Sequence, residues 1–412
     1  MLLPADTGAG RLMDLLAAAL DGTGPAILPV DPGLPPARLA ALLDALAPAT
    51  VETTQGTERM VLSPSRAPGR GRAPGSAGEL GPDTAVVIAT SGSTGEPKGV
   101  ELSAAALRHS ARASLDRIGA RPGDTWLSCL PPSHIAGLQV FIRSLLAGTA
   151  PVVRDRLDAA AAAGCQFVSL VPTQLRRLVD GRDARAALAP FRRILLGGAA
   201  PPPGLLESAR SAGGNVTITY GMTETCGGCV YDHIPLDGVS AEVGADGRIR
   251  IAGPVLFSGY RGRADLTEQA MDGPWFVTSD IGEMRASGGL TVLGRSDGMI
   301  NTGGEKVAAD EVAAALEALP GVREAAVVGR PDAEWGEVVT AIVAAARPAE
   351  PPALADLRAQ LKSRLPGFAL PRALVLVAAL PLLPSGKPDL LALRALAAPG
   401  GPAADGGPPG PQ

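Results

Sequence analysis

Cysteine is scarce in this sequence. The 412 residues include four cysteines, at Cys129, Cys165, Cys226 and Cys229. A disulfide-stabilised scaffold of this length would need many more. The last two have the C-x-x-C spacing of metal and redox sites, but no second such pair and no histidine pair at a zinc-finger interval accompanies them. We therefore interpret them as small residues in a tight, glycine-rich loop.

A long apolar run is also missing. The longest candidate, residues 373–384, is short and broken by proline, whereas a membrane-spanning helix needs about 20 apolar residues. Residues 1–11 lack the basic stretch and apolar core of a secretory signal. From both absences we expect a cytoplasmic protein with no membrane insertion.

Excess positive charge is absent as well. The net charge is −4, with 46% apolar and 19% charged residues. This balance suits a globular protein with a real core. It does not favour nucleic acid or an anionic membrane surface as a partner.

Lysine is rare among the basic residues: four of the 37 are lysine and the rest are arginine. A position that keeps lysine against this bias is interpreted as one that needs a compact ammonium group. Lys98, Lys306 and Lys387 all lie in glycine-rich motifs.

The pattern of apolar residues predicts two unequal domains. Leucine and alanine recur at helical spacing within residues 11–22 and 35–47. From residue 84 to about 260, short β-like runs alternate with helical segments, which favours a largely parallel sheet flanked by helices. From residue 244, short strands indicate a small β-rich subdomain. Beyond residue 299, a helix–strand–strand–helix–strand order indicates a compact α+β unit.

The predicted fold is therefore a large α/β N-terminal domain with a small, mobile α+β C-terminal domain. The predicted boundaries are 1–295 for the large domain with an exposed linker or loop at 64–83, 296–298 for a hinge, 299–397 for the small lid domain, and 398–412 for a disordered tail.

Residues 90–99, TSGSTGEPKG, suggest a phosphate site. Three glycines and four hydroxyl side chains supply donors for an anion-binding nest. The Walker pattern does not fit, because Pro97 precedes Lys98 and Gly99 follows it. Taken alone, the segment is either a different kind of phosphate loop or a polar loop between strands.

Five further motifs follow in order and resemble those of the adenylate-forming superfamily, which includes acyl-CoA synthetases, adenylation domains and luciferases. They are LLGGAAPPP at 195–203, TYGMTET at 219–225, TSDIGE at 278–283, GRSDGMINTGGEKV at 294–307 and PSGKPD at 384–389. The resemblance implies that a carboxylate attacks the α-phosphate of ATP, pyrophosphate leaves, and a thiol then attacks the acyl-adenylate.

The resemblance also implies roles for residues at matching positions. ATP or AMP would contact Thr90, Ser91, Gly92, Ser93, Thr94, Gly95, Lys98, Gly197, Gly198, Ala199, Tyr220, Gly221, Met222, Thr223, Asp280 and Arg295. Thr223 would contact the α-phosphate, and Glu224 would bind Mg²⁺, a cation that favours carboxylate oxygens. Asp280 would accept hydrogen bonds from the ribose.

Lys387 would stabilise the negative charge that develops between carboxylate and α-phosphate. Because it belongs to the small domain, that domain must close to deliver it. The resemblance implies rotation about Asp297 to a second state, in which Gly303, Gly304 and Lys306 face the CoA step. The alternative is that Lys387 is an ordinary surface lysine.

Two features depart from the superfamily pattern. Asn301 stands where many members carry lysine, and only about 90 residues precede the phosphate loop. The short N-terminal part leaves less room for a large or lipid-like substrate.

Residues 130–148, 167–178 and 224–232 resemble the o-succinylbenzoate-CoA ligases of menaquinone synthesis. The acyl site would then comprise His134, Gln139, Arg143, Gly198, Thr225, Cys226 and Gly227. The second carboxylate of such an aromatic dicarboxylate needs a cation or several donors. His134 and Arg143 are the candidates, although His134 is alternatively structural and Arg143 alternatively faces solvent.

Three other interpretations stay open. The chain is alternatively another small acyl- or aryl-CoA synthetase, a stand-alone adenylating enzyme, or a catalytically dead binding protein on the same fold. The thiol acceptor is free CoA or a carrier protein acting in trans, since no carrier motif adjoins. A homodimer is also compatible with the sequence.

Overall fold

The structure is a computed structural model. It describes residues 2–4, 8–31, 36–53, 56–59, 80–81, 83–91, 97–154, 157, 162–202, 204–295, 298–302, 305–332, 335–383 and 388–398. Several predictions concern positions outside this set: Gly92, Ser93, Thr94, Gly95, Asp297, Gly303, Gly304, Lys387, most of the 64–83 linker, and the tail after Ala398. The side chains of Ser91, Asn301 and Lys306 are likewise not described. Among the described residues, no helix combines the length and apolarity that a membrane span requires.

The N-terminal segment forms the two predicted helices, α1 (Ala9–Leu20) and α2 (Pro36–Leu46). It also forms a four-stranded sheet that the sequence did not indicate. Its order is β2 (Leu28–Val30), β1 (Leu2–Pro4), β3 (Thr50–Thr53) and β4 (Gly56–Arg59). Strands of three or four residues are too short to show a two-residue period, so pattern reasoning missed them.

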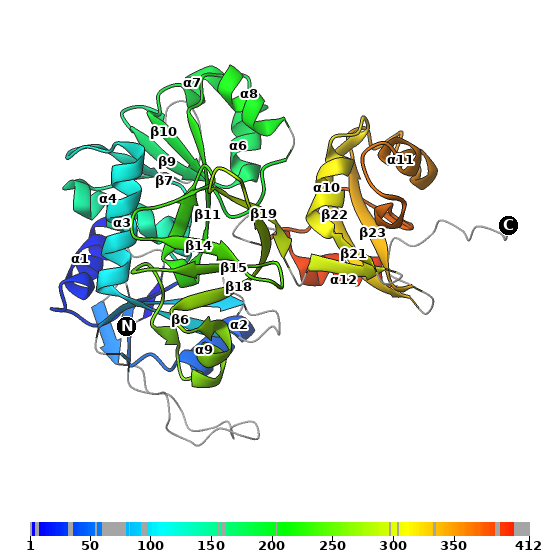
Figure 1. The fold of residues 1–412 in the computed structure, drawn as a ribbon. Coiled ribbons are helices and arrows are strands. Elements are labelled where there is room, and N and C mark those ends of the chain that lie inside the picture. Colours follow the sequence, from blue (N-terminus) through cyan, green and yellow to red (C-terminus); the bar gives the residue numbers. More distant parts are fainter. Residues whose placement is uncertain are drawn as a thin grey trace.

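A seven-stranded sheet forms the centre of the large domain (Figure 1). Its order is β13 (Ile234–Pro235), β12 (Gly227–Tyr231), β11 (Val216–Met222), β10 (Arg193–Leu196), β9 (Phe167–Leu170), β7 (Trp126–Ser128) and β8 (Val152–Val153). The five strands from β11 to β8 are parallel, and β12 and β13 continue the sheet antiparallel. The predicted parallel sheet is therefore confirmed in this region.

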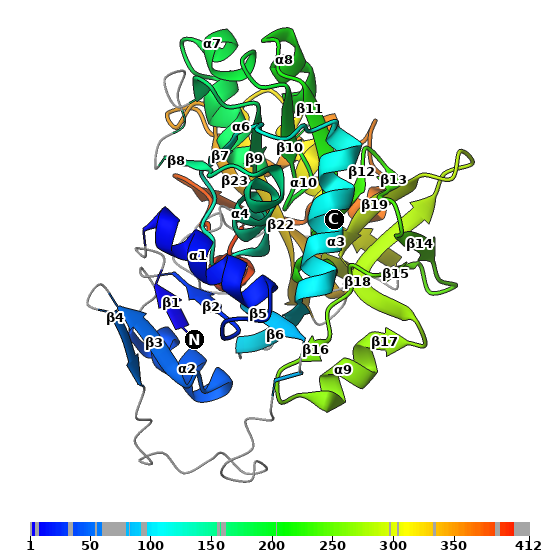
Figure 2. The ribbon, with the colours of Figure 1, turned by 90° about the vertical axis from the view of Figure 1, so that its left-hand side faces the viewer.

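Helices cover both faces of this sheet. They are α3 (Ala104–Ile118) and α4 (Ile135–Ala147) on one face, and α6 (Pro172–Val179), α7 (Ala184–Leu188) and α8 (Leu205–Ser211) on the other (Figure 2). Neighbouring strand residues point to opposite helices: Phe167 packs toward α3 and α4, and Val168 toward α6 to α8. Burial on both faces explains why these strands are continuous apolar runs.

The apolar run at 85–89 belongs to a different sheet, which corrects the prediction that it joins the parallel one. It lies in β5 (Thr84–Ser91), which pairs antiparallel with β6 (Pro97–Ser103), and β6 pairs with β16 (Gly259–Tyr260). Five residues connect β5 to β6, and a parallel crossover requires a dozen or more. The glycine-rich segment therefore joins two strands of a hairpin.

The predicted β-rich subdomain is present. It contains β14 (Ser240–Val243), β15 (Arg248–Ala252), β17 (Met271–Asp272), β18 (Trp275–Met284) and β19 (Leu290–Arg295), with α9 (Ala264–Ala270) beside it.

The small domain stands beside the large one with its own core (Figure 1). Its elements are β20 (Met299–Thr302), β21 (Glu305–Ala308), α10 (Ala309–Glu317), β22 (Val322–Asp332), β23 (Gly336–Ala345), α11 (Leu354–Leu361), β24 (Ala373–Val377) and α12 (Leu390–Ala397). The predicted helix–strand–strand–helix–strand order is found from α10 to β24.

Candidate active site

A cavity of about 580 Å³ opens at the carboxyl ends of the parallel strands. Leu130 follows β7, Val171 follows β9 and Gly197 follows β10, and all three line it. This edge is the usual ligand site of an open α/β sheet. Leu383 of the small domain also lines the cavity, so both domains contribute to its wall. The volume suits a small-molecule substrate.

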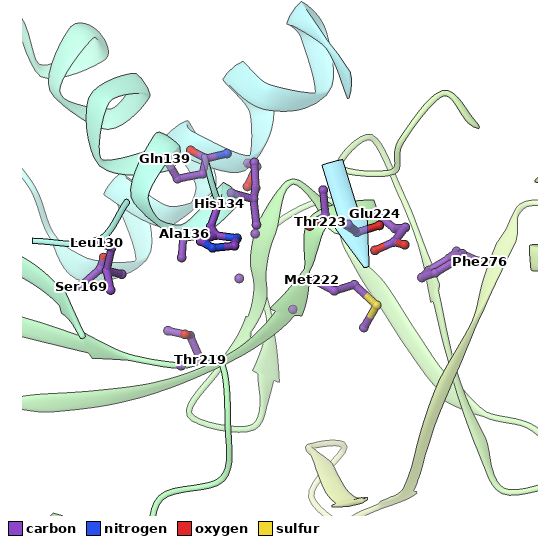
Figure 3. A pocket seen from close by; sticks show the side chains of 18 of the residues that line it. Leu130, His134, Ala136, Gln139, Ser169, Thr219, Met222, Thr223, Glu224 and Phe276 are labelled. Atoms are coloured by element: carbon purple, nitrogen blue, oxygen red, sulfur yellow. The ribbon is translucent and has the colours of Figure 1, made fainter. Parts of the chain in front are cut away.

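Most of the predicted site residues that the structure describes meet at this cavity. They are Thr90, Lys98, His134, Gln139, Arg143, Gly197, Gly198, Gly221, Met222, Thr223, Glu224, Gly227 and Arg295. In Figure 3, Thr223, Glu224 and Phe276 lie on one side, while His134, Gln139 and Ser169 lie on the other. The structure thus brings residues of both predicted sets to one space, with Thr223 and Glu224 across it from His134 and Gln139.

His134 lies where a tight turn enters α4. It is the residue immediately before that helix, with its backbone extended at φ −109° and ψ 147°. The turn packs so closely on the helix that a Cβ at Gly137 would approach the Pro131 carbonyl oxygen to 2.2 Å. Glycine is therefore required at this position, and the close packing fixes the position from which His134 points into the cavity (Figure 3).

Arg143 lines the cavity and is buried, so it does not face solvent. Its side chain comes from the buried side of α4, and the residue is 4% exposed. The guanidinium lies 4.1 Å from the centre of the Trp126 ring. It donates hydrogen bonds to the Ser114 and Ser169 hydroxyls, both at 3.3 Å. No carboxylate of the described residues forms an ion pair with it.

Without a bound ligand, the buried charge on Arg143 therefore destabilises the protein. Burial lowers the pKa of the guanidinium, because a cation loses its hydration there. Its side-chain hydrogen-bond partners are neutral hydroxyls. One of them, Ser114, is in turn hydrogen-bonded to the Tyr231 hydroxyl at 2.8 Å. A bound anion would supply the missing countercharge.

The turn between β11 and β12 forms part of the cavity wall. A Cβ at Gly221 would lie 2.0 Å from the Gly227 carbonyl oxygen, so the two strands approach as closely as glycine allows. Cys226 connects them in a left-handed conformation with φ 52°. Gly227 and Gly228 line the cavity and leave space next to it.

Thr225 and Cys226, predicted to contact the acyl group, lie behind this wall. The Thr225 hydroxyl lies 2.8 Å from the Gly227 carbonyl oxygen and accepts a hydrogen bond from the Met222 amide at 2.9 Å. The Cys226 carbonyl accepts a hydrogen bond from the Gln139 side-chain amide at 2.7 Å. Both residues are fully buried and shape the turn rather than the cavity surface.

All four cysteines are free thiols. Burial raises the pKa of the Cys129 and Cys229 thiols to about 12, and burial also raises that of Cys226. These thiols are therefore poor nucleophiles and poor metal ligands.

Glu224 lies across the cavity from Ser169, which is a hydrogen-bond partner of Arg143 (Figure 3). Its Oε1 accepts a hydrogen bond from the Tyr260 hydroxyl at 2.9 Å, and the Lys98 ammonium lies 5.5 Å from the centre of the Tyr260 ring. Among the described residues, no group of three or more His, Cys, Asp or Glu side chains gathers to hold a metal. A single carboxylate suits Mg²⁺, which keeps water ligands and binds through one or two carboxylates plus substrate phosphates.

Asp280, predicted to hold the ribose, is engaged with neighbours rather than placed on the cavity surface. Its Oδ2 accepts a hydrogen bond from the Tyr220 hydroxyl at 2.7 Å, and its Oδ1 lies 3.7 Å from Arg295 Nη1. Burial and the Asp280 charge both raise the pKa of Tyr220. Neither Asp280 nor Tyr220 lines the cavity, and Ala199 is exposed outside it.

Sequence reasoning missed several polar residues of the cavity. They are Ser110, Ser114, Ser169, Tyr231 and Tyr260. One signal was available: Ser110 and Ser114 are four residues apart, and this spacing places two hydroxyls on one face of a helix. The other three reach the cavity only through long-range packing.

Comparisons with known proteins agree with this geometry. Residues 15–261 match the AMP-binding enzyme family, and residues 311–387 match the AMP-binding enzyme C-terminal domain. A protein of Mycobacterium tuberculosis described as a probable 2-succinylbenzoate–CoA ligase is 44% identical over 328 residues, covering 76% of this chain and 85% of that protein.

Two solved structures of o-succinylbenzoate CoA synthetase from Bacillus subtilis are also similar. One, in complex with the acyl-adenylate intermediate, is 30% identical with a TM-score of 0.68, covering 74% of this chain and 68% of that one. The other, in complex with ATP and a magnesium ion, is 25% identical with a TM-score of 0.77, covering 94% of this chain and 87% of that one.

Proposed function

Because this chain belongs to the AMP-binding enzyme family, we propose that it is an ATP-dependent acid–thiol ligase that converts o-succinylbenzoate to o-succinylbenzoyl-CoA in menaquinone synthesis. A carboxylate oxygen of the acid attacks the α-phosphorus of ATP, and the bond to pyrophosphate breaks. The CoA sulfur then attacks the activated carbonyl, loses its proton, and displaces AMP. The 2-succinylbenzoate–CoA ligase relatives support the substrate.

The buried Arg143 is the observation that carries the substrate proposal. A substrate with two carboxylates places one at the reacting centre and leaves the other to pair with a cation. Arg143 offers that cation in a site where water does not screen it, since it is 4% exposed and has hydroxyls as its side-chain partners. Charge-assisted hydrogen bonds to a carboxylate are the strong kind. A monocarboxylate would leave this charge uncompensated.

The other end of the cavity is proposed to hold the nucleotide. Mg²⁺ bound there would neutralise phosphate charge, and among the described residues that line the cavity Glu224 is the carboxylate that would hold it. Lys98 and Thr90 reach the cavity from the strands on either side of the glycine-rich segment, where they would bind phosphate oxygens. Thr223 precedes Glu224 and would contact the α-phosphate. These groups act by position and charge, since no covalent enzyme intermediate is required.

His134 is proposed to act between the two ends. Its ring points into the centre of the cavity, between Gln139 and the Thr219 side of the sheet (Figure 3). The imidazole there would orient the acid through a hydrogen bond from a ring nitrogen. Gln139 donates through its amide nitrogen to the Cys226 carbonyl and so supports the wall. Because it also lines the cavity, its predicted contact with the acid remains part of the proposal.

The small domain is proposed to deliver Lys387 to the reacting carboxylate. The support is Leu383, four residues earlier, which already lines the cavity. The boundaries 1–295 and 299–397, the hinge at Asp297, and the CoA-facing roles of Gly303, Gly304 and Lys306 remain part of this proposal. They predict that one domain arrangement serves adenylation and another serves thioester formation.

Two further proposals concern context. ATP and CoA are cytoplasmic metabolites, which supports action in the cytoplasm. A homodimer is a prediction that light scattering on the purified chain will test.

An acid panel tests the function. Pyrophosphate release is measured with ATP, Mg²⁺ and CoA in the presence of o-succinylbenzoate, benzoate or short fatty acids. We expect o-succinylbenzoate to give the highest kcat/KM. Much better turnover of benzoate would refute the assignment and favour another aryl-CoA synthetase. Release of pyrophosphate without a CoA thioester would favour a stand-alone adenylating enzyme, and no release with any acid would favour a binding protein.

A further inference from the structure

Tyr260 touches two charged groups of the nucleotide end at once. Its hydroxyl donates to Glu224 Oε1 at 2.9 Å, and its ring face lies 5.5 Å from Lys98 Nζ. These contacts join β16, β6 and the turn after β11, which are distant in the sequence. We propose that Tyr260 is a positioning residue that holds Glu224 toward the metal and keeps Lys98 from pairing with it. The inference rests on the nucleotide site in the proposed function, but not on the identity of the acid.

The segment that carries Tyr260 is fixed on both sides. The Phe257 amide donates to the Glu224 backbone carbonyl at 2.8 Å, and the Arg261 amide donates to the Gly99 carbonyl at 2.7 Å. Residues 257–261 therefore bridge the Glu224 turn to the strand that contains Lys98. This backbone attachment sets the distance between the two charged residues before any side chain is considered.

The ring of Tyr260 is fixed by aromatic packing. It meets Phe257 edge-on with centres 5.0 Å apart, and Phe257 meets Phe276 at 5.3 Å. The Tyr260 amide also donates to the Thr267 hydroxyl at 2.9 Å. A side chain held at its ring and at its backbone is preorganised to orient its hydroxyl.

The separation of the two charges matters for function. Lys98 and Glu224 both line the cavity, yet the described residues show no ion pair between them. A direct ion pair would neutralise the carboxylate that a metal needs and the ammonium that a phosphate needs. Tyr260 offers each group a separate partner: a hydrogen-bond donor for the carboxylate and a negative ring face for the ammonium. Its hydroxyl takes one carboxylate oxygen and leaves Oε2 for the cation.

Tyr260→Phe isolates the hydrogen bond, since the ring and its contact with Lys98 remain. The measurement is Mn²⁺ binding by electron paramagnetic resonance, in the presence of an ATP analogue with a methylene bridge between the α- and β-phosphates. We expect Mn²⁺ affinity to fall about 10-fold or more, as for other groups that orient a metal ligand. Pyrophosphate affinity measured without metal should stay within about twofold, because Lys98 keeps its position.

Tyr260→Leu removes the spacer as well. Lys98 and Glu224 then become free to pair, so both Mn²⁺ affinity and metal-free pyrophosphate affinity should fall. Tyr231→Phe is the matched control: it removes a buried tyrosine hydroxyl of the same cavity that bonds Ser114 instead, and should leave Mn²⁺ affinity unchanged.

Thioester formation from pre-made acyl-adenylate reports on the fold, because that step contains no pyrophosphate. Tyr260→Phe should retain it. Unchanged Mn²⁺ affinity in Tyr260→Phe would overturn the inference. Equal loss of both half-reactions would also overturn it, by showing that Tyr260 only supports the fold. Mn²⁺ binding needs no acid, so failure of the o-succinylbenzoate assignment would leave this test intact.

Discussion

Arg143→Met removes the buried cation while keeping a side chain of similar length. The acid pocket would lose its charged partner for the second carboxylate. The Ser114 hydroxyl would keep its hydrogen bond to Tyr231, and the Trp126 ring would still have a side chain packed on it. The variant therefore tests charge more than shape.

The expected size follows from burial. Removing one partner of a buried, hydrogen-bonded charge pair costs about 2–5 kcal/mol. Solvent does not screen this pair, because Arg143 is 4% exposed. At about 1.4 kcal/mol per factor of ten, kcat/KM for o-succinylbenzoate should fall roughly 30-fold to several thousand-fold. The stability of the substrate-free protein should be unchanged or higher, because an uncompensated buried ion has been removed.

The assay compares o-succinylbenzoate with the two monocarboxylates in which one or the other carboxylate is replaced by hydrogen. The analogue that keeps the reacting carboxylate should be a poor substrate of the natural enzyme. Its kcat/KM should change little or not at all in Arg143→Met. Arg143→Lys keeps the charge without the planar guanidinium, so its kcat/KM for o-succinylbenzoate should lie between those of the natural enzyme and Arg143→Met.

An equal loss for the dicarboxylate and the reactive monocarboxylate would refute this reasoning. It would mean that Arg143 supports the pocket structure and does not recognise the second carboxylate. Urea unfolding of both variants shows whether the fold is intact.

Three further predictions follow from other parts of the molecule. Lys387→Ala should raise the activation free energy of adenylate formation by at least about 2–3 kcal/mol, and it should leave thioester formation from pre-made adenylate unchanged. An equal loss of rate in both half-reactions would exclude the two-state hinge. Gly137→Ala should destabilise the protein by about 3 kcal/mol, measured by urea unfolding, because its Cβ would lie 2.2 Å from the Pro131 oxygen; an unchanged midpoint would show that the turn relaxes. Burial raises the pKa of the Cys129 and Cys229 thiols to about 12, so the folded protein keeps protons that the unfolded chain releases above about pH 8.5. The free energy of unfolding should therefore fall as pH rises from about 9 to 12. A variant with both Cys129→Ala and Cys229→Ala should show a shallower fall.

The sequence predicted the elements of the fold well where one pattern extends over many residues. The small domain is an example: the apolar spacing of α10 and the long apolar runs of β22 and β23 are visible in the sequence and form one core. The N-terminal sheet was missed because its strands have three or four residues. The prediction that β5 joins the parallel sheet was wrong, because a strand buried on both faces has the same continuous apolar pattern in a parallel and in an antiparallel sheet.

The sequence likewise predicted only part of the candidate site. Residues within ordered motifs, such as Glu224 and Lys98, reach the cavity as expected. Thr225 and Cys226 do not, because the tight glycine turn points them inward, and a motif does not reveal which side of a turn faces the ligand. The contact of Tyr260 with Glu224 spans 36 residues. It depends on how β16 packs against the turn after β11, which no local pattern encodes.

The most direct test of the proposed ligase activity is competition among three acids for the same enzyme. The purified chain is incubated with ATP, Mg²⁺ and CoA and an equimolar mixture of o-succinylbenzoate, benzoate and butyrate, and the thioesters and AMP are quantified by liquid chromatography with mass spectrometry. We expect o-succinylbenzoyl-CoA as the dominant thioester, formed in equal amount to AMP. Dominance of benzoyl-CoA or butyryl-CoA, or AMP without any thioester, would contradict it.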